Sequence, residues 1–175
     1  MTCTLILMRH AKSSWDTPTL SDHERPLNDR GRASASAMGD WLRARGHLPD
    51  AAVSSDSTRT GQTFVVLGFD VPVDYTRALY HAGPEVMMDV LRNQTAATVL
   101  MLGHNPGIAD FAGRLVNARP PHPRFDDYPT CATTVIRFDV DGWNDIGWRN
   151  GQPIDFTIPR ELTKGARKTR TLHQF

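Results

Sequence analysis

An arginine and a histidine stand side by side near the start of this chain, directly after an apolar run. Arg9 and His10 follow residues 5–8, which are all apolar. A neutral imidazole is a capable nucleophile near pH 7, because the pKa of a free histidine side chain is about 6.5. A neighbouring guanidinium can hold phosphate oxygens in a planar fork. The pair therefore has the chemistry to bind a phosphoryl group and attack its phosphorus, if other residues complete the site.

Two more basic side chains follow apolar runs further along the chain. Arg59 comes shortly after residues 51–54, near the expected start of a helix, where backbone amides and the helix dipole favour an anion. His104 comes directly after residues 98–103. Taken singly, Arg59 could be a solvated helix charge, and His104 could be a turn histidine bonded to its own backbone. Their value depends on whether the fold brings them to Arg9 and His10.

The elements that must position these residues alternate between strand and helix patterns. Apolar or alternating runs predict strands at residues 4–8, 51–54, 71–75, 98–102, 133–140 and 152–158. Helical spacing predicts helices from the N-cap Asn28 to the stop at Gly46, from a cap at Ser55 or Ser57 to Leu67, from Pro84 to about Arg92, and from about Ile108 to Val116. The proline-rich residues 119–129 are predicted to be a loop.

Strand and helix alternation of this kind implies a mostly parallel sheet with helices on both faces. In such folds ligands bind outside the carboxyl ends of the strands. Arg9 and His10 lie at the end of the first predicted strand, Arg59 follows the second and His104 follows the fourth. All four residues would therefore meet at one edge of the sheet. This convergence favours a shared phosphate pocket over four unrelated surface residues.

Composition places the chain among single-domain globular proteins. It has 175 residues, of which 39% are hydrophobic and 22% charged, with a formal net charge of +1. That balance argues against a nucleic-acid partner. Cys3 and Cys131 lack the spacing of a metal site or disulfide scaffold, which favours buried or idle thiols in a reducing compartment. The N-terminus lacks signal-peptide features and no run is long enough to cross a bilayer, so we expect a cytoplasmic protein without a membrane partner.

Four motifs give the chain a clear family likeness. It resembles the histidine phosphatase superfamily, whose Arg-His-Gly or Arg-His-Ala motif carries a phosphorylated histidine, and within it the compact SixA-type phosphohistidine phosphatases. The motifs lie at residues 8–15, 22–28, 55–60 and 103–107, and the resemblance covers residues 4–162. It implies a phosphoglycerate-mutase-like fold, a three-layer α/β/α sandwich with a mostly parallel central sheet. We expect one histidine phosphatase domain at residues 1–162 and a basic tail at residues 163–175.

The resemblance also implies a role for each motif residue. His10 would attack phosphorus through one ring nitrogen and become transiently phosphorylated, while its other nitrogen donates to a backbone carbonyl. Arg9, Arg59 and His104 would surround the equatorial oxygens, with His104 contributing most when protonated. No metal or other cofactor is required, and no acidic cluster with Mg²⁺ spacing is visible in the sequence.

One role in the family pattern is not clearly filled. Many members carry a glutamate general acid in the loop after the third strand, but here Tyr80 stands near that position. Asp16, Asp22 and Glu85 remain possible acids, although Glu85 also reads as a first-turn helix residue. An alkyl phosphate needs its leaving oxygen protonated, whereas phosphohistidine leaves readily once its imidazole is protonated. The departure from the pattern therefore favours phosphohistidine as the substrate.

Other polar side chains near these motifs could bind substrate. Arg25 and Asn28 would order the long loop at residues 12–27, and Arg25 could also touch substrate. Lys12 could attract phosphate or simply be solvated. The tail contains Lys164, Arg167, Lys168 and Arg170, which could bind an acidic partner or remain a solvated end.

The sequence thus predicts a metal-independent phosphatase that acts on phosphohistidine in a protein. An alternative within the same chemistry is a broad-specificity phosphomonoesterase for small phosphorylated metabolites. A mutase fits less well, because retaining an intermediate calls for a closed site and the chain is short. A non-catalytic phosphate-binding module is the alternative of another class, and the presence of a nucleophile argues against it.

Overall fold

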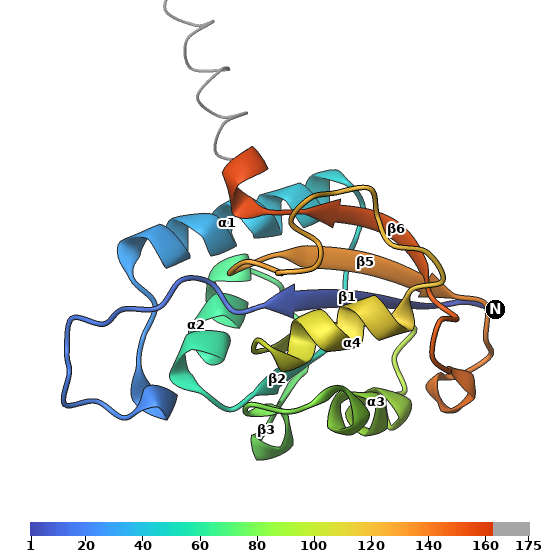
Figure 1. Cartoon of the computed structure of the whole chain (residues 1–175), viewed down its shortest axis with the longest axis horizontal. Coiled ribbons are helices and arrows are strands. Elements are labelled where there is room, and N and C mark those ends of the chain that lie inside the picture. Colours follow the sequence, from blue (N-terminus) through green and yellow to red (C-terminus); the bar gives the residue numbers. More distant parts are fainter. Residues whose placement is uncertain (163–175) are drawn as a thin grey trace, which may run out of the picture.

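The computed structural model describes residues 1–162 and contains one sheet of six strands. The strands are β1 (Cys3–Arg9), β2 (Ala51–Ser55), β3 (Val73–Thr76), β4 (Thr98–Gly103), β5 (Thr133–Phe138) and β6 (Gln152–Thr157). Their order across the sheet is β3-β2-β4-β1-β5-β6. The first four strands in this order are parallel, while β5 runs antiparallel to both β1 and β6 (Figure 1). The sheet is therefore mostly parallel, as the alternation of elements predicted.

Helices cover both faces of this sheet, and the side chains of β1 explain why. The helices are α1 (Asp29–Ala44), α2 (Thr58–Leu67), α3 (Pro84–Arg92) and α4 (Gly107–Leu115). Successive side chains of a strand point to opposite faces. Ile6 and Met8 belong to the core that contains the inner faces of α1 and α2, whereas Leu5 and Leu7 belong to the core of α3 and α4. All four are fully buried. The three-layer α/β/α fold is thus confirmed.

The parallel strands end at a common edge, and the active-site motifs follow there. Arg9 at the end of β1 pairs with Gly103 at the end of β4, and the His10 amide donates to the Gly103 carbonyl at 3.1 Å. The end of β2 at Ser55 lies on the other side of β4. Long connections extend from this edge, including the loop at residues 12–27 that projects beyond β1 in Figure 1.

Helix starts follow the predicted caps closely. The Asn28 side chain accepts the Gly31 amide at 2.8 Å and begins α1. Ser57, one of the two predicted candidates, accepts the Thr60 amide and begins α2. These bonds satisfy amides that would otherwise lack a partner in the first turn.

Some strand ends differ from the prediction by a few residues, for physical reasons. β3 begins at Val73 rather than residue 71, since Pro72 has no amide hydrogen to give to a ladder. β5 ends at Phe138 rather than Val140, because its neighbour β1 begins at Cys3, the residue opposite Phe138. α4 begins and ends one residue earlier than expected. None of these shifts moves a motif residue off the common edge.

Two further expectations concern features outside the site. Cys3 and Cys131 are both free and buried, in agreement with idle thiols. No helix within residues 1–162 is long and apolar enough to cross a membrane. The basic tail predicted at residues 163–175 lies outside the described residues.

Candidate active site

His10 lies just past β1 with one ring nitrogen committed and the other available. Its Nδ1 donates to the Ala11 carbonyl at 2.7 Å, which leaves Nε2 with a lone pair. The Ala11 amide in turn donates to the Thr63 hydroxyl of α2 at 3.0 Å, and Thr63 donates to the Arg59 carbonyl at 2.7 Å. The backbone–imidazole bond expected from the family pattern is therefore present, and α2 fixes the backbone that makes it.

Burial keeps this imidazole neutral. The His10 side chain is buried, and its pKa is lowered to about 3, mainly by desolvation and in part by the charges of Arg59, Arg9 and Arg25. The hydrogen bond to Ala11 opposes that shift without reversing it. At neutral pH Nε2 consequently keeps an unprotonated lone pair, which faces the Arg59 Nε at 3.4 Å and can attack an electrophile once that long contact is given up.

Arg59 joins the two site histidines. It projects from the first turn of α2, and only 2% of its surface is exposed. Its Nε donates toward His10 Nε2 at 3.4 Å and its Nη2 donates to His104 Nδ1 at 3.2 Å. The two imidazole rings lie 5.2 Å apart between centroids. The prediction that separate strand ends bring these residues together is confirmed by the fold.

His104 follows β4 and is held on both ring nitrogens. An arginine has no acceptor, so Nδ1 accepts from Arg59 and the ring hydrogen lies on Nε2, which donates to the Ser55 hydroxyl at 2.8 Å. The pKa of His104 is lowered to about 2, mainly by desolvation and in part by the neighbouring His10 and Arg59. A phosphoryl dianion beside the ring would act in the opposite direction. His104 is therefore a neutral donor here, not the cation that would contribute most.

Two guanidiniums at the site carry buried N–H groups without a partner. Arg9 donates through Nη1 to the Tyr128 carbonyl at 3.2 Å, but its Nε bonds to nothing within residues 1–162. Arg25 lies 3.4 Å from an Asp22 oxygen through Nη2, while its Nε and Nη1 have no partner in the same range. Its guanidinium also stacks over Trp15, 3.5 Å from the ring centroid. Unpaired charged donors are costly when buried, and an oxyanion is the ligand that would satisfy them.

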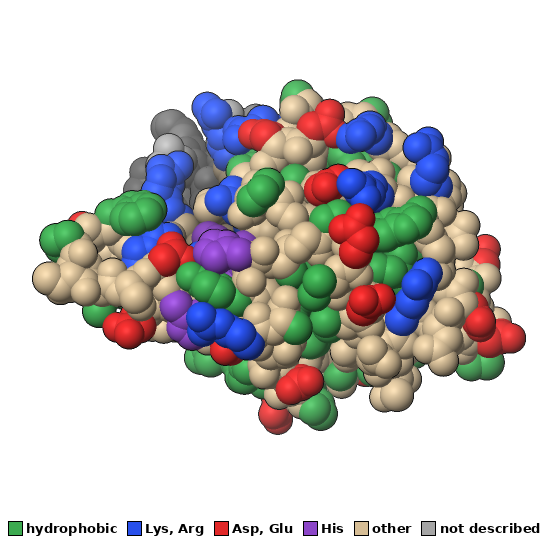
Figure 2. Space-filling view, turned by 60° about the horizontal axis from the view of Figure 1, so that its bottom comes forward, with side chains coloured by type: hydrophobic (Ala, Val, Ile, Leu, Met, Phe, Trp, Pro, Cys, Tyr) green, Lys and Arg blue, Asp and Glu red, His purple; other side chains and the backbone are tan. Residues whose placement is uncertain are grey.

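These side chains line one pocket of about 340 Å³. Figure 2 shows histidine side chains grouped with lysine and arginine side chains at the base of the projecting loop. The pocket contains seven of the predicted residues and five that were not predicted. The predicted residues are Arg9, His10, Lys12, Asp22, Arg25, Arg59 and His104; the others are Ser13, Trp15, His81, Asn105 and Thr130.

Three predicted residues do not line this pocket. The Asn28 side chain is occupied by the helix cap and by a 3.5 Å bond to the Ser13 carbonyl, so it orders the loop rather than facing substrate. Asp16 is exposed on that loop. Glu85 is exposed on the first turn of α3 and forms an ion pair with Arg114 at 3.0 Å. Of the three possible general acids, only Asp22 is among the described residues that line the pocket.

Asp22 reaches the pocket from the long loop and is surrounded by donors. Its Oδ2 accepts from Tyr80 at 2.5 Å, from His81 at 3.0 Å and from Arg59 at 3.1 Å. Desolvation acts to raise the pKa of Asp22, but the bonds from Tyr80, His81 and Arg59 outweigh it and hold the pKa below its usual range. Asp22 is therefore a carboxylate at neutral pH and a weak proton donor.

His81 is the titratable pocket residue that sequence reasoning missed. It lies in the loop after β3, has a positive φ of 53° and contacts Asp22. A signal was available, because His81 directly follows Tyr80, the residue already noted in place of the family glutamate. Ser55 and Thr63 were also missed as positioning residues, since a serine or threonine beside a strand or helix has too many ordinary uses to single out. No group of three or more metal-ligating side chains occurs in the part of the chain described.

Comparisons with known proteins agree with this geometry. The sequence pattern of the histidine phosphatase superfamily (branch 1) matches residues 5–83. An uncharacterized protein of Mycobacterium tuberculosis strain H37Rv is 32% identical over 160 residues, which cover 87% of this chain and 100% of the relative. The chain belongs to the histidine phosphatase superfamily and is a histidine-based phosphatase.

Solved structures place it near one branch of that superfamily. The putative phosphohistidine phosphatase SixA from Nakamurella multipartitia is 31% identical with a TM-score of 0.77, covering 91% of this chain and 97% of the other. The putative SixA from Agrobacterium tumefaciens, 24% identical with a TM-score of 0.73, covers 90% of this chain and 98% of its own and shares the fold. The SixA-like resemblance inferred from the motifs is thereby confirmed.

Proposed function

We propose that this phosphatase hydrolyses phosphohistidine in a cytoplasmic protein, and that residues 1–162 act as its single catalytic domain. The observation that carries the proposal is the state of Asp22, the one carboxyl group among the described residues that line the pocket. Three donors hold it as an anion. The pocket therefore offers a nucleophile and anion-binding groups without a carboxylic acid ready to protonate a leaving group.

The proposed reaction begins at His10 Nε2. This nitrogen attacks phosphorus in line with the leaving group, so a new phosphorus–nitrogen bond forms as the substrate's own phosphorus–nitrogen bond breaks. The substrate imidazole leaves neutral when its second nitrogen is already protonated. Water then attacks phospho-His10, which releases inorganic phosphate and returns the imidazole.

The cationic and neutral donors around His10 stabilise charge during both steps. The unpaired N–H groups of Arg9 and Arg25 and the guanidinium of Arg59 belong to residues that line the pocket, and they would hold the equatorial oxygens. His104 also lines the pocket, within hydrogen-bond reach of Arg59. A phosphoryl dianion would raise its pKa, and protonation at Nδ1 would then add a fourth cationic group. Lys12 lines the pocket and would attract the incoming anion.

Leaving-group chemistry decides between phosphohistidine and phosphate esters. An alkoxide is a strong base and needs a proton in the transition state, which a carboxylate such as Asp22 cannot supply. Tyr80 and His81 donate to Asp22, so their hydrogens point away from a leaving oxygen. A protonated phosphohistidine needs no such donor. The same argument predicts measurable turnover of p-nitrophenyl phosphate, whose phenolate leaves without full protonation.

The test compares kcat/KM for a phosphohistidine peptide, p-nitrophenyl phosphate and a panel of sugar phosphates. Phosphorus NMR at neutral pH follows all of them, because acidic reagents hydrolyse the phosphorus–nitrogen bond. We expect the order phosphohistidine, then p-nitrophenyl phosphate, then sugar phosphates, with all three lost in His10→Ala and none affected by a metal chelator. A clear preference for sugar phosphates would refute the substrate. Phosphate binding without turnover of any compound would leave only a binding module.

A further inference from the structure

A second pocket of about 540 Å³ adjoins the catalytic one. Lys12, in the loop after β1, and Thr130, just before β5, line both pockets, so the two lie side by side. We call this second pocket the basic pocket. It is lined by Lys12, Arg30, Ala33, Ser34, Arg124, Pro129, Thr130, Ile158, Pro159 and Arg160.

Its lining carries four cations and, among the residues described there, no carboxylate. Lys12, Arg30, Arg124 and Arg160 come from four different segments of the chain. Arg124 forms an ion pair with Asp127 at 2.9 Å, but Asp127 is not part of the lining. Cations converging on one hollow from separate segments create a positive potential that attracts an anionic ligand.

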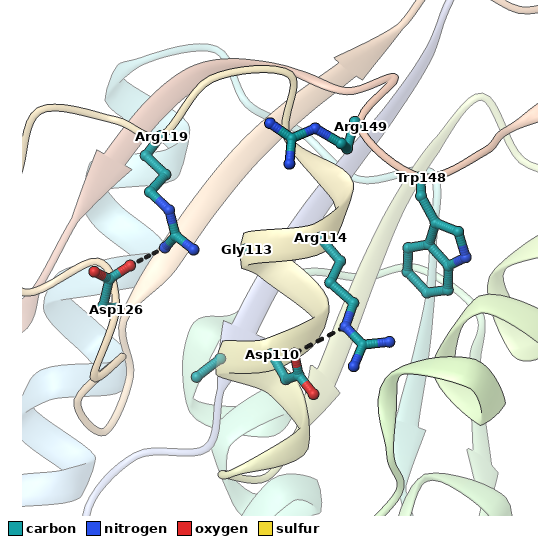
Figure 3. A pocket seen from close by; sticks show the side chains of 8 residues that line it. Asp110, Gly113, Arg114, Arg119, Asp126, Trp148 and Arg149 are labelled. Carbon is teal, nitrogen blue, oxygen red and sulfur yellow. Dashed lines mark hydrogen bonds and ion pairs between the residues drawn. The ribbon is translucent and has the colours of Figure 1, made fainter.

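A pocket on α4 shows that this charge is not a general property of the surface. That pocket, of about 440 Å³, is lined by Arg114, Arg119 and Arg149, together with Asp110 and Asp126 (Figure 3). Arg114 is paired with Asp110, and Arg119 with Asp126. Its lining holds two carboxylates beside its three arginines, whereas the described lining of the basic pocket holds four cations and no carboxylate. Of these two pockets outside the catalytic centre, the basic pocket therefore has the more positive lining.

We propose that the basic pocket binds acidic side chains that flank the phosphohistidine of the protein substrate. The inference rests on the proposed function, because it extends the substrate of that same site. Its arginines Arg30 and Arg160 are exposed and lie on separate elements, in contrast to the buried guanidiniums that meet at His10. Such a spread fits several carboxylates along a peptide better than one phosphate. Apolar atoms of Ala33, Pro129 and Ile158 supply a surface for the peptide backbone and its carbon chains.

The position of the basic pocket beside the catalytic one determines where the residues next to a phosphohistidine would lie. Because Lys12 faces both pockets, a peptide whose phosphohistidine is attacked by His10 would place its flanking residues over the cations. The enzyme would therefore prefer a peptide with negative charges next to the phosphorylated residue. A small phosphorylated metabolite has no such flanking residues.

The experiment uses two peptides that differ only in charge. Both carry one phosphohistidine, flanked by three glutamates in one and by three glutamines in the other. The measured quantity is the ratio of their kcat/KM values, for the full chain and for the double variant Arg30→Gln, Arg124→Gln. The ratio cancels any general loss of activity. Arg149→Gln is the matched control, because it removes an exposed arginine that lines the pocket on α4.

For the unmodified chain we expect the glutamate peptide to be preferred about tenfold at low ionic strength, since an exposed charge pair contributes up to roughly fivefold. In the double variant the preference should fall to about twofold, and raising the salt to about 0.5 M, roughly ten times the concentration in the low-salt buffer, should reduce the preference of the unmodified chain similarly. Arg149→Gln should keep the tenfold preference. An equal rate for both peptides, or an unchanged ratio in the double variant, would overturn the proposal.

A binding arm keeps this inference separate from the proposed function. The same peptides with unphosphorylated histidine are labelled and titrated by fluorescence anisotropy, which needs no turnover. Tighter binding of the glutamate peptide, lost in the double variant, supports the basic pocket even if no phosphopeptide is hydrolysed. Equal binding of both peptides refutes the pocket even if phosphohistidine is the substrate. A preference for a sugar bisphosphate over its monophosphate, lost in the double variant without any peptide preference, would assign the pocket to a second phosphate and refute the peptide.

Discussion

Arg25 is expected to hold the phosphoryl group at little expense to the stability of the fold. Its guanidinium is buried, yet Nε and Nη1 find no partner within the described chain. Replacing it by glutamine removes two charged donors from the pocket. A hydrogen bond to a charged group contributes about 1.5–3 kcal/mol, so losing one to phosphate weakens binding by roughly 10- to 150-fold.

The same substitution should change folding stability by less than about 1 kcal/mol. It loses the stacking of Arg25 on Trp15, an exposed ring, which is a contribution of about 0.5–1 kcal/mol. It also loses a 3.4 Å contact with the half-exposed Asp22. In the opposite direction, it removes donors that are buried without partners, and this relieves a desolvation penalty of similar size.

Two measurements on Arg25→Gln test this reasoning. The inhibition constant of inorganic phosphate against p-nitrophenyl phosphate hydrolysis reports anion binding, and urea unfolding reports stability. Arg43→Gln is the control with the reverse signature: Arg43 donates to the Leu67 carbonyl at 2.7 Å and does not line the pocket. It should lose stability and keep phosphate binding. Unchanged phosphate inhibition in Arg25→Gln, or a loss of stability equal to that of Arg43→Gln, would show that Arg25 is a structural residue.

Three further predictions concern stability. In the unfolded chain His10 and His104 bind a proton with a pKa near 6.5, whereas their pKa values in the native state are lowered to about 3 and about 2. The stability of the fold is therefore retained above about pH 6.5. It falls on acidification by up to roughly 1.4 kcal/mol per pH unit for each histidine. Urea unfolding at several values between about pH 7.5 and 4.5 measures how the free energy of unfolding depends on pH. If His104→Gln left that pH dependence unchanged, the reasoning would be contradicted. Gly31→Ala should destabilise by about 1–3 kcal/mol, because its Cβ would lie 2.1 Å from a backbone oxygen of the loop after β1; Gly142→Ala, with open space around it, is the control and should have almost no effect in thermal melts. Tyr128→Phe should cost about 1–2 kcal/mol, since its fully buried hydroxyl donates at 2.6 Å to a carbonyl of β1; an unchanged urea midpoint would show that the carbonyl is satisfied without it.

The fold could be predicted because the hydrophobic pattern of its central strands shows which of their faces are buried. A run such as residues 5–8, apolar at every position, is expected only where both faces of a strand are covered. In a mostly parallel sheet, ligands bind at the carboxyl ends of the strands, and this rule predicts that Arg9, His10, Arg59 and His104 lie together. Their proximity follows from topology, and the exact loop conformations were not needed for it.

The rest of the site depends on contacts that leave no local pattern. Asp22 meets Arg59, Tyr80 and His81 across separations of 37, 58 and 59 residues. A long polar loop has neither helical nor strand periodicity, so nothing in residues 12–27 indicates which of its carboxylates turns inward. Asn28 illustrates the same difficulty, because an asparagine before a helix is equally suited to cap the helix or to bind substrate. Only the 2.8 Å bond to Gly31 decides for the cap.

Asp22 links the strength of the anion site to the choice of leaving group. Arg59 spans both histidines and is almost wholly buried, so its position depends on the Asp22 carboxylate and carbonyl that it contacts at 3.1 and 2.6 Å. The carboxylate can serve as this counter-ion only while it is ionised, and the donors that keep it ionised also direct their hydrogens to it. A site arranged in this way gains a fixed arginine for the phosphoryl oxygens and gives up an acid for the leaving atom. That exchange would suit the proposed phosphohistidine substrate, because its leaving imidazole can bring its own proton.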